Sequence, residues 1–421
     1  MNYNINKKNQ NDFKIYDNYA FSNDNIKNTN NKKDRVIFKI VSFFALVFFC
    51  LNIILISVLY FNVKNNINKK ININYYNVSV DENKATTFAV QNSIKSSVCI
   101  AAGGFAYDED SFFEQTSSRG SGVIFKIDDN SDFVYILTCF HVVSGYNSIY
   151  VLFPMSLEPV TATIVGFTEY YDIAVLKTKI PFNIFNYKEI DIRDSQFLSV
   201  GENVFAVGNS LSGGISVTDG VISRLNKEVV IEGETFREIQ TDASINPGNS
   251  GGGLFDINGN FVGLINAKLS SITSSNVVMS VEGTAFAIPS NFSVSIAESI
   301  IKNLGKPTFV DFGLKLKNSE KYVSELNIDN NLIFDYEVRV EKIDKNSFMK
   351  DFLKENDIIL SFKYFNLSGE LKEVLMTNKF CLEDVIFDIK ENSNIEFKII
   401  QPLFGDEYNI VVTIPAKIIQ N

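Results

Sequence analysis

From about residue 85 onward, the chain is divided into short apolar runs that are rich in β-branched and aromatic residues. Each run is too short for a stable helix and is bounded by Gly, Asn, Asp or Ser, which favour turns. The runs are VYILTCFHVV, SIYVLF, ATIVGF, DIAVLK, NVFAVG and FVGLINA. This pattern predicts a mostly β fold, either a barrel or a sandwich.

One clear helix is predicted at the end of this β region, in SNFSVSIAESIIKNLGKP. Ser290 is its predicted N-cap, and Gly305 followed by Pro307 is its predicted stop. The following segment, residues 308–421, has mixed signals and predicts a small α+β domain. Its predicted strands are YEVRVEKI, DIILSF, IEFKII and YNIVVTI, the last two forming a hairpin around Gly405 and Asp406, and its predicted helices are SFMKDFLKEND and CLEDVIFDIKE.

An uncharged apolar stretch runs from Ile40 to Val63. At about 1.5 Å per residue, a helix of this length crosses a hydrocarbon core of roughly 30 Å. The alternative, a cleaved signal peptide, has a shorter apolar region and a small-x-small cleavage site, and neither feature is present. Lysine and arginine are more frequent just before the stretch than just after it, which favours a cytoplasmic N-terminus.

The predicted organisation therefore has five parts. They are a disordered cytoplasmic tail (1–35), a transmembrane anchor (36–63) that holds the chain in the cell membrane as a single-pass protein, a linker (64–84), an extracytoplasmic β domain (85–305) and the α+β domain (308–421).

Composition narrows the function. With 421 residues, of which 45% are hydrophobic, the chain can bury more than one core. A net charge of -10, without basic stretches after the first 70 residues, argues against nucleic acid as a partner. The four cysteines are far apart and form no CxxC pattern, so the sequence indicates no zinc site, although it leaves a Cys99–Cys139 disulfide open. The chain has one histidine, His141, and any mechanism that needs an imidazole must use it.

The stretch NPGNSGGG places Ser250 among glycines. With a positive φ, Gly248 turns the backbone N–H groups of Gly248, Asn249 and Ser250 toward one point, which makes an anion-binding nest beside the hydroxyl. The glycines that follow, Gly251 and Gly252, let a substrate backbone approach closely. These features favour a nucleophilic serine. The alternative is that the stretch is only a tight turn between strands.

Two further residues fit this chemistry. His141 stands at the end of an apolar strand, and Asp172 opens DIAVL. Taken singly, each has a structural explanation, as a half-buried histidine and as a turn aspartate. In the order His, Asp, Ser on a β background, however, they match the chymotrypsin arrangement of base, orienting acid and nucleophile.

Seven motifs in the same order resemble those of the HtrA/Deg serine proteases. They are RGSGVIF, LTCFHVV, YDIAVLK, SVGENVFAVGNS, VTDGVISRL, QTDASINPGNSGGGLFDINGNFVGLINA and GTAFAIPSN, within residues 85–305. The resemblance implies a two-barrel, trypsin-like fold with His141 as general base, Asp172 as its orienting acid and Ser250 as nucleophile. It also implies an oxyanion hole made by the N–H groups of Gly248 and Ser250, and a homotrimer.

The same resemblance implies a substrate preference. Ser244 and Ile245 would lie near the base of the specificity pocket and Thr284 and Ala285 near its wall. None is charged, so a small or medium aliphatic residue is expected there. The strand 265–267 would pair with the substrate backbone. The segment 268–283 resembles the activation loop of the family, and the alternative is an ordinary surface loop.

The C-terminal domain resembles a divergent PDZ domain. In LKENDIIL, Asn356 replaces the glycine of the family pattern, which is acceptable because asparagine adopts left-handed conformations. Phe312, Gly313 and Leu314 resemble the loop that binds a peptide C-terminus. The alternative for these three residues is an ordinary strand.

The predicted function is a membrane-anchored serine endopeptidase that acts on misfolded or exposed protein segments, for extracytoplasmic quality control. The alternative is a proteolytically idle chaperone or stress sensor that binds protein C-termini through the PDZ-like domain. The sequence implies no metal and no organic cofactor.

Overall fold

The computed structural model describes residues 43, 46, 48, 52, 53, 82–103, 118–128, 131–154, 156, 158–180, 187–210, 214–231, 234–267, 271–274, 277–280, 283–320, 336–401, 407–414 and 419–420. The chain divides into two units, Met1–Ser79 and Val80–Asn421. The predicted tail, most of the predicted anchor and most of the linker lie outside the described residues. Within the described ranges, no helix has both the length and the apolar character needed to cross a membrane.

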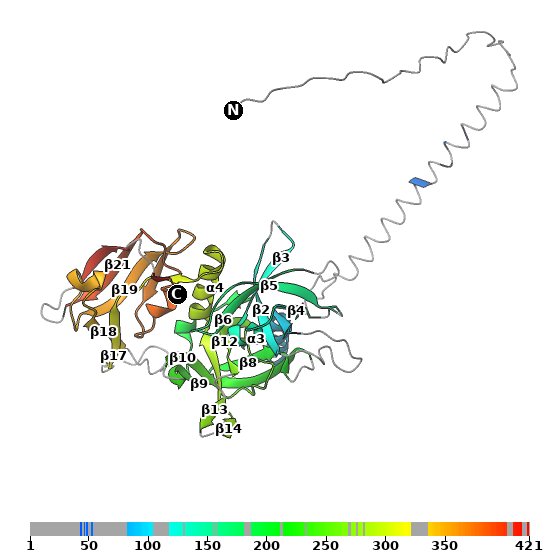
Figure 1. The fold of residues 1–421 in the computed structure, drawn as a ribbon, viewed down its shortest axis with the longest axis horizontal. Coiled ribbons are helices and arrows are strands. Elements are labelled where there is room, and N and C mark those ends of the chain that lie inside the picture. Colours follow the sequence, from blue (N-terminus) through cyan, green and yellow to red (C-terminus); the bar gives the residue numbers. More distant parts are fainter. Residues whose placement is uncertain are drawn as a thin grey trace, which may run out of the picture. The chain divides into compact units, whose positions relative to one another are not determined.

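Six strands close the first barrel of Val80–Asn421, in the order β1-β2-β3-β6-β5-β4. Strands β2 to β6 are labelled in Figure 1. Antiparallel pairing of β1 with both β2 and β4 completes the ring. The apolar side chains predicted from the sequence fill it, and Ile100, Ile136 and Leu137 are fully buried. The strands are β1 Ser97–Ala102, β2 Ser118–Ile127, β3 Phe133–Cys139, β4 Ile149–Leu152, β5 Val160–Thr168 and β6 Ile173–Lys179.

A seven-stranded sheet forms the second barrel, in the order β11-β8-β9-β10-β15-β12-β7. An additional pairing of β11 with β12 closes six of these strands into a ring, and β7 adds to β12 in parallel. The predicted mostly β, two-barrel fold is confirmed. The strands are β7 Asp191–Ile192, β8 Asn203–Gly208, β9 Ser216–Ile231, β10 Glu234–Thr241, β11 Gly253–Asp256, β12 Asn260–Ile265 and β15 Ala285–Pro289.

Two longer helices accompany the barrels, α2 (Glu82–Lys95) and α4 (Ser290–Lys302). The prediction that Ser290 caps α4 is wrong, because Pro289 holds the N-cap position and the Ser290 hydroxyl donates to the Arg193 carbonyl at 2.6 Å. The stop is as predicted: Gly305 has a φ of 105°, and its N–H donates to the carbonyl of Ile300.

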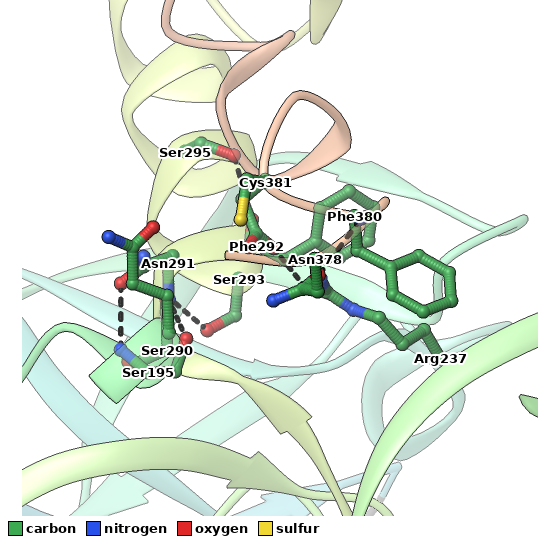
Figure 2. A network of polar contacts seen from close by, with 12 residues as sticks. Ser195, Arg237, Ser290, Asn291, Phe292, Ser293, Ser295, Asn378, Phe380 and Cys381 are labelled. Carbon is green, nitrogen blue, oxygen red and sulfur yellow. Dashed lines mark hydrogen bonds and ion pairs between the residues drawn. The ribbon is translucent and has the colours of Figure 1, made fainter. Parts of the chain in front are cut away.

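The first turn of α4 is tied to a short 3-10 helix, η1 (Ser195–Phe197). The Ser195 N–H donates to Asn291 Oδ1 at 3.1 Å, and the Asn291 N–H donates to Ser195 Oγ at 3.3 Å (Figure 2). These reciprocal bonds satisfy backbone donors that a helix start leaves without intrahelical partners.

The C-terminal domain contains an antiparallel sheet in the order β17-β18-β19-β21-β22, with β20 paired to β19. The four predicted strands are present, whereas β16, β20 and β23 were not predicted; β17 begins at Leu314, where an ordinary strand was the alternative to a peptide-binding loop. Neither predicted helix forms as an α-helix: SFMKDFLKEND contains only the 3-10 helix η4 (Phe348–Asp351), and CLEDVIFDIKE only the 3-10 turn η5 (Glu383–Val385). The strands are β17 Leu314–Glu320, β18 Tyr336–Ile343, β19 Ile358–Phe365, β20 Leu371–Leu375, β21 Asn394–Ile400 and β22 Glu407–Thr413, with η4 at Phe348–Asp351 and a short pair of β16 Thr308–Phe309 with β23 Ile419–Gln420.

A buried ion pair joins this domain to the second barrel. Arg237 of β10 pairs with Asp384 of η5, and the two side chains are only 6% and 5% exposed. The Arg237 guanidinium also lies over the ring of Phe380, 5.1 Å from its centroid (Figure 2). At the edge of the same contact, Lys379 pairs with Glu228 at 2.7 Å, with both side chains partly exposed.

Replacing Arg237 by methionine should destabilise the protein by about 3–5 kcal/mol, because Asp384 would remain buried without its counter-charge. Thermal unfolding of the full-length chain measures the loss. The double variant Arg237→Met/Asp384→Leu should recover most of it, since an apolar pair of similar volume needs no charge compensation. As a control from the same contact, Lys379→Met breaks a partly exposed pair and should cost less than about 1 kcal/mol. Equal losses in the two single variants would contradict the expectation.

Candidate active site

Strand pairing brings His141 and Asp172 together. Strand β3 pairs with β6 so that Cys139 lies opposite Ile173, which places the residues just beyond each strand end side by side. His141 lies in α3 (Phe140–Val143), a four-residue helix that follows β3, and not on the strand itself. The backbone fixes the arrangement, because the Phe140 N–H donates to the carbonyl of Asp172 at 3.0 Å.

Both carboxylate oxygens of Asp172 accept hydrogen bonds from His141. Oδ1 accepts the backbone N–H at 2.8 Å, and Oδ2 lies 2.6 Å from the imidazole Nδ1. Since a carboxylate can only accept, Nδ1 carries a hydrogen, and in the neutral imidazole Nε2 keeps its lone pair. The φ of Asp172 is 54°, a left-handed conformation that aspartate tolerates better than most residues. The arrangement leaves Nε2 free to act as a base.

Ser250 lies on a loop that is hydrogen-bonded to strands of both barrels. Its carbonyl accepts the Ser121 N–H at 2.8 Å, and the Ser121 hydroxyl donates to the Gly248 carbonyl at 2.6 Å. On the other side, the Gly251 N–H donates to the carbonyl of Ile265 in β12 at 2.9 Å. Among the described residues, no hydrogen bond joins the Ser250 hydroxyl to His141. The serine is therefore fixed by its backbone, and its side chain is left without a recorded partner.

Only glycine fits at position 251. Its φ is 81°, and an added Cβ would lie 2.2 Å from Thr138 Oγ1 and 2.3 Å from the Ser121 carbonyl oxygen. Real Cβ atoms do not approach other atoms so closely. The absence of a side chain therefore lets the Ser250 loop of the second barrel touch strands β2 and β3 of the first.

The three predicted oxyanion donors differ from one another. Gly248 has the positive φ predicted for it, 101°. Within the described part of the chain, the backbone N–H groups of Gly248 and Ser250 have no recorded acceptor. The Asn249 N–H, in contrast, donates to the Asn246 carbonyl at 3.0 Å, so it is not available to a substrate. The structure therefore leaves two of the three predicted donors open.

The four predicted specificity residues come from two segments that β10 and β15 bring close, with Thr241 opposite Ala285. Ala285 is 1% exposed, whereas Ser244 is exposed and its carbonyl accepts the Thr218 hydroxyl. Ile245 and Thr284 are half-buried.

The predicted substrate strand 265–267 and the predicted activation loop 268–283 follow one another in the chain. Strand β12 ends at Ile265, and the Asn266 N–H donates to the Phe286 carbonyl at 3.0 Å. Asn266 is 3% exposed, and among the described residues its Oδ1 has no hydrogen-bond partner. In segment 268–283, β13 (Ser271–Ser274) pairs with β14 (Val277–Ser280) as a hairpin.

One acidic residue near the site was not predicted. Glu238 of β10 is 1% exposed, and its Oε2 has no hydrogen-bond partner among the described residues. Burial raises the pKa of the Glu238 carboxyl well above its ordinary value; Arg237 opposes this shift and the negative charge of Asp172 adds to it. The sequence EIQT does not predict a buried carboxyl at this position, because an acidic residue in a strand is ordinarily solvent-exposed.

The predicted peptide-binding loop borders a cavity of about 290 Å³ in the C-terminal domain. Phe312 is itself a core residue, 4% exposed, whereas its neighbours Gly313 and Leu314 are half-buried. The Gly313 N–H donates to Asp311 Oδ1 at 2.8 Å, which occupies one of the expected carboxylate donors. Asn356 has the predicted left-handed conformation, with a φ of 73°.

Comparison with known proteins agrees with this geometry. Residues 120–264 match the family model described as trypsin-like peptidase domain. A "Serine protease Do-like HtrA" of Lactococcus lactis subsp. cremoris is 35% identical over 247 residues, which cover 57% of this chain and 58% of that protein. A "Serine protease HtrA-like" of Staphylococcus haemolyticus is 32% identical over 285 residues, covering 65% of this chain and 41% of that protein.

The chain thus spans about half the length of the curated relatives it matches. A solved structure described as "HtrA-type protease AlgW with tripeptide" has 23% sequence identity and a TM-score of 0.48, and the match covers 78% of this chain and 96% of that one. The family model and the sequence relatives agree with the predicted resemblance: residues 120–264 match a trypsin-like peptidase domain, and the chain is similar to HtrA serine proteases.

Proposed function

We propose that this protein is a membrane-anchored serine endopeptidase of HtrA type, which hydrolyses peptide bonds in misfolded or exposed protein segments. The observation that carries the proposal is the pair of hydrogen bonds from His141 to Asp172, made by the only histidine of the chain. Ser250 supports it, because its loop is held between the two barrels with two backbone donors open.

The reaction follows from these groups. Ser250 Oγ attacks the scissile carbonyl while His141 Nε2 takes the hydroxyl proton, and Asp172 stabilises the imidazolium that forms. The N–H groups of Gly248 and Ser250 bind the oxyanion of the tetrahedral intermediate. His141 then gives its proton to the leaving amine, and an acyl-enzyme remains. Water, activated by His141 in the same way, hydrolyses the ester and returns the serine.

The membrane location, the substrate preference, the assembly and the cellular role are also proposed. The apolar segment 40–63 would anchor the chain with its N-terminus in the cytoplasm, so that the protease faces outward. The uncharged pocket residues Ser244, Ile245, Thr284 and Ala285 favour a small or medium aliphatic side chain in the substrate. Assembly as a homotrimer and a role in protein quality control complete the proposal, as the family resemblance implies.

A second candidate is a binding protein without proteolytic activity. The cavity of about 290 Å³ beside Gly313 and Leu314 favours it, because β17 is an edge strand there, and a peptide can add to such an edge as a further strand. Such a protein would capture the C-termini of other chains, as a chaperone or a stress sensor.

Covalent labelling separates the two candidates. A fluorophosphonate probe should react with the full-length protein, and mass spectrometry should locate the phosphonyl group on the peptide that contains Ser250, because only an activated serine attacks the probe. Denatured protein serves as the control and should remain unlabelled. If folded protein also remains unlabelled and fails to degrade casein, while it binds C-terminal peptides, the binding candidate is correct.

A further inference from the structure

A cysteine thiol lies beside the catalytic pair. Cys139, the last residue of β3, is fully buried and forms no disulfide. Its Sγ donates to the carbonyl of Ile265 at 3.3 Å. One ligand atom each from Cys139, His141 and Asp172 lie within 4.8 Å of one another, and the described residues contain no other such cluster of three or more potential metal ligands.

This donor set suits a thiophilic divalent cation. Thiolate, imidazole and carboxylate are the three side-chain ligands that zinc uses, and three protein ligands leave its fourth position open to water. Charge favours the same ion, because a thiolate and a carboxylate together neutralise a divalent cation. A neutral cluster avoids the cost of an isolated charge in a largely buried place.

We propose that Cys139, His141 and Asp172 form an inhibitory binding site for Zn²⁺ and cations of its class. The consequence for activity rests on the proposed role of His141 as general base. Binding converts the resting hydrogen-bonded pair of His141 and Asp172 into two ligands of one metal ion.

The proton balance is simple. The Cys139 thiol releases one proton to solvent and binds as thiolate. The imidazole remains neutral, because its proton moves from Nδ1 to Nε2 when Nδ1 binds the metal. Two ligand atoms at about 2.1 Å from a tetrahedral ion lie roughly 3.4 Å apart. His141 Nδ1 and Asp172 Oδ2, now 2.6 Å apart, therefore need to separate by less than about 1 Å.

Metal binding would stop proteolysis at its first step. With a hydrogen on Nε2, His141 cannot take the proton of Ser250. The side chains of His141 and Asp172 are 29% and 14% exposed, so a cation can reach the cluster from their side although the thiol is buried. Removal of the cation by a chelator restores the original tautomer, and inhibition is therefore reversible.

Inhibition measurements test the site. Zn²⁺ should inhibit casein degradation by the full-length protein, and a chelator should reverse this. In Cys139→Ser, the Zn²⁺ concentration for half inhibition should rise at least about 100-fold. Loss of a residue that only hydrogen-bonds to a metal ligand already lowers metal affinity by up to about 100-fold. Each variant is compared with its own metal-free rate. The matched control is Cys99→Ser, which alters a thiol that is also buried but lies outside the cluster, and it should keep the sensitivity of the parent.

A binding measurement is independent of catalysis. Because the chain has one histidine, selective isotope labelling gives a single imidazole spectrum. In full-length Ser250→Ala, Zn²⁺ should shift the His141 resonances at a stoichiometry of one ion per chain, and Co²⁺ should produce a thiolate-to-metal charge-transfer band. Cys139→Ser on the same background should abolish the band; Cys139→Ala replaces it if the serine variant does not fold.

The outcomes are distinct. An unshifted imidazole spectrum, absence of the charge-transfer band, or equal Zn²⁺ sensitivity of Cys139→Ser and Cys99→Ser would overturn the metal site. If the cation binds as expected but fluorophosphonate does not label Ser250, the metal site stands and the proposed protease function fails. If labelling succeeds without cation binding, the reverse holds.

Discussion

Replacing Ser250 by alanine should lower the turnover of a peptide or ester substrate by about 10⁶-fold. The substitution removes the Oγ that would form the acyl-enzyme. The fold should be unaffected, because the residue is held by its backbone: its carbonyl accepts the Ser121 N–H, a bond that alanine keeps. Initial rates and the thermal unfolding midpoint of the full-length protein measure the two expectations.

Ser223→Ala is the matched control for this prediction. Ser223 is an exposed residue of β9, so both rate and midpoint should remain those of the parent. A Ser250→Ala variant that keeps more than about a thousandth of the parental rate would point to a different nucleophile, since the remaining triad members contribute little without it. A large drop in the midpoint would instead mean that the side chain supports the fold.

Replacing Asp172 by asparagine should lower turnover by about 10⁴-fold. Both carboxylate oxygens accept hydrogens from His141, one from its backbone N–H and one from Nδ1. An amide offers a single oxygen. If the amide oxygen accepts the backbone N–H, its NH₂ group faces Nδ1 and forces the imidazole into the tautomer with hydrogen on Nε2. That tautomer cannot take the serine proton.

Single-turnover kinetics with an ester substrate measure this effect on the acylation step. Asp194→Asn is the control of the same chemistry, because Asp194 caps η1 through its Oδ1 and asparagine caps a helix equally well. The control should retain the parental rate. A loss of less than about tenfold in Asp172→Asn would show that Asp172 only orients the short helix α3 and does not determine the tautomer of His141.

The sequence predicted where the strands of the barrels lie more reliably than which strands pair with one another. The run VYILTC forms β3 and DIAVLK forms most of β6. Both could be predicted because the hydrophobic period and the content of β-branched residues reflect local backbone conformation. The pairing of Cys139 with Ile173 is a long-range property, and no local pattern reports it. The order of His141, Asp172 and Ser250 suggested a triad, but only the three-dimensional structure shows that both carboxylate oxygens of Asp172 bond to His141.

The errors have tertiary causes. CLEDVIFDIKE has helical period, but Asp384 is drawn to Arg237 of another domain, and a 3-10 turn forms in place of a helix. Ser290 has the composition of an N-cap, but its hydroxyl bonds the carbonyl of Arg193, which is distant in sequence. The cluster of Cys139, His141 and Asp172 has no signal in the sequence spacing, because only the pairing of β3 with β6 brings Asp172 to the other two residues.

The close contact at Gly251 has a consequence for how such a chain can evolve. The histidine and aspartate belong to one barrel and the serine to the other, and the bonds of Ser121 and the absence of a side chain at Gly251 set their separation. Residues at this contact cannot change in one barrel alone, because a larger side chain on one barrel requires a smaller one on the other. Exchange of a whole barrel between relatives would therefore preserve two intact folds and still lose the proposed activity unless these contacts are inherited together.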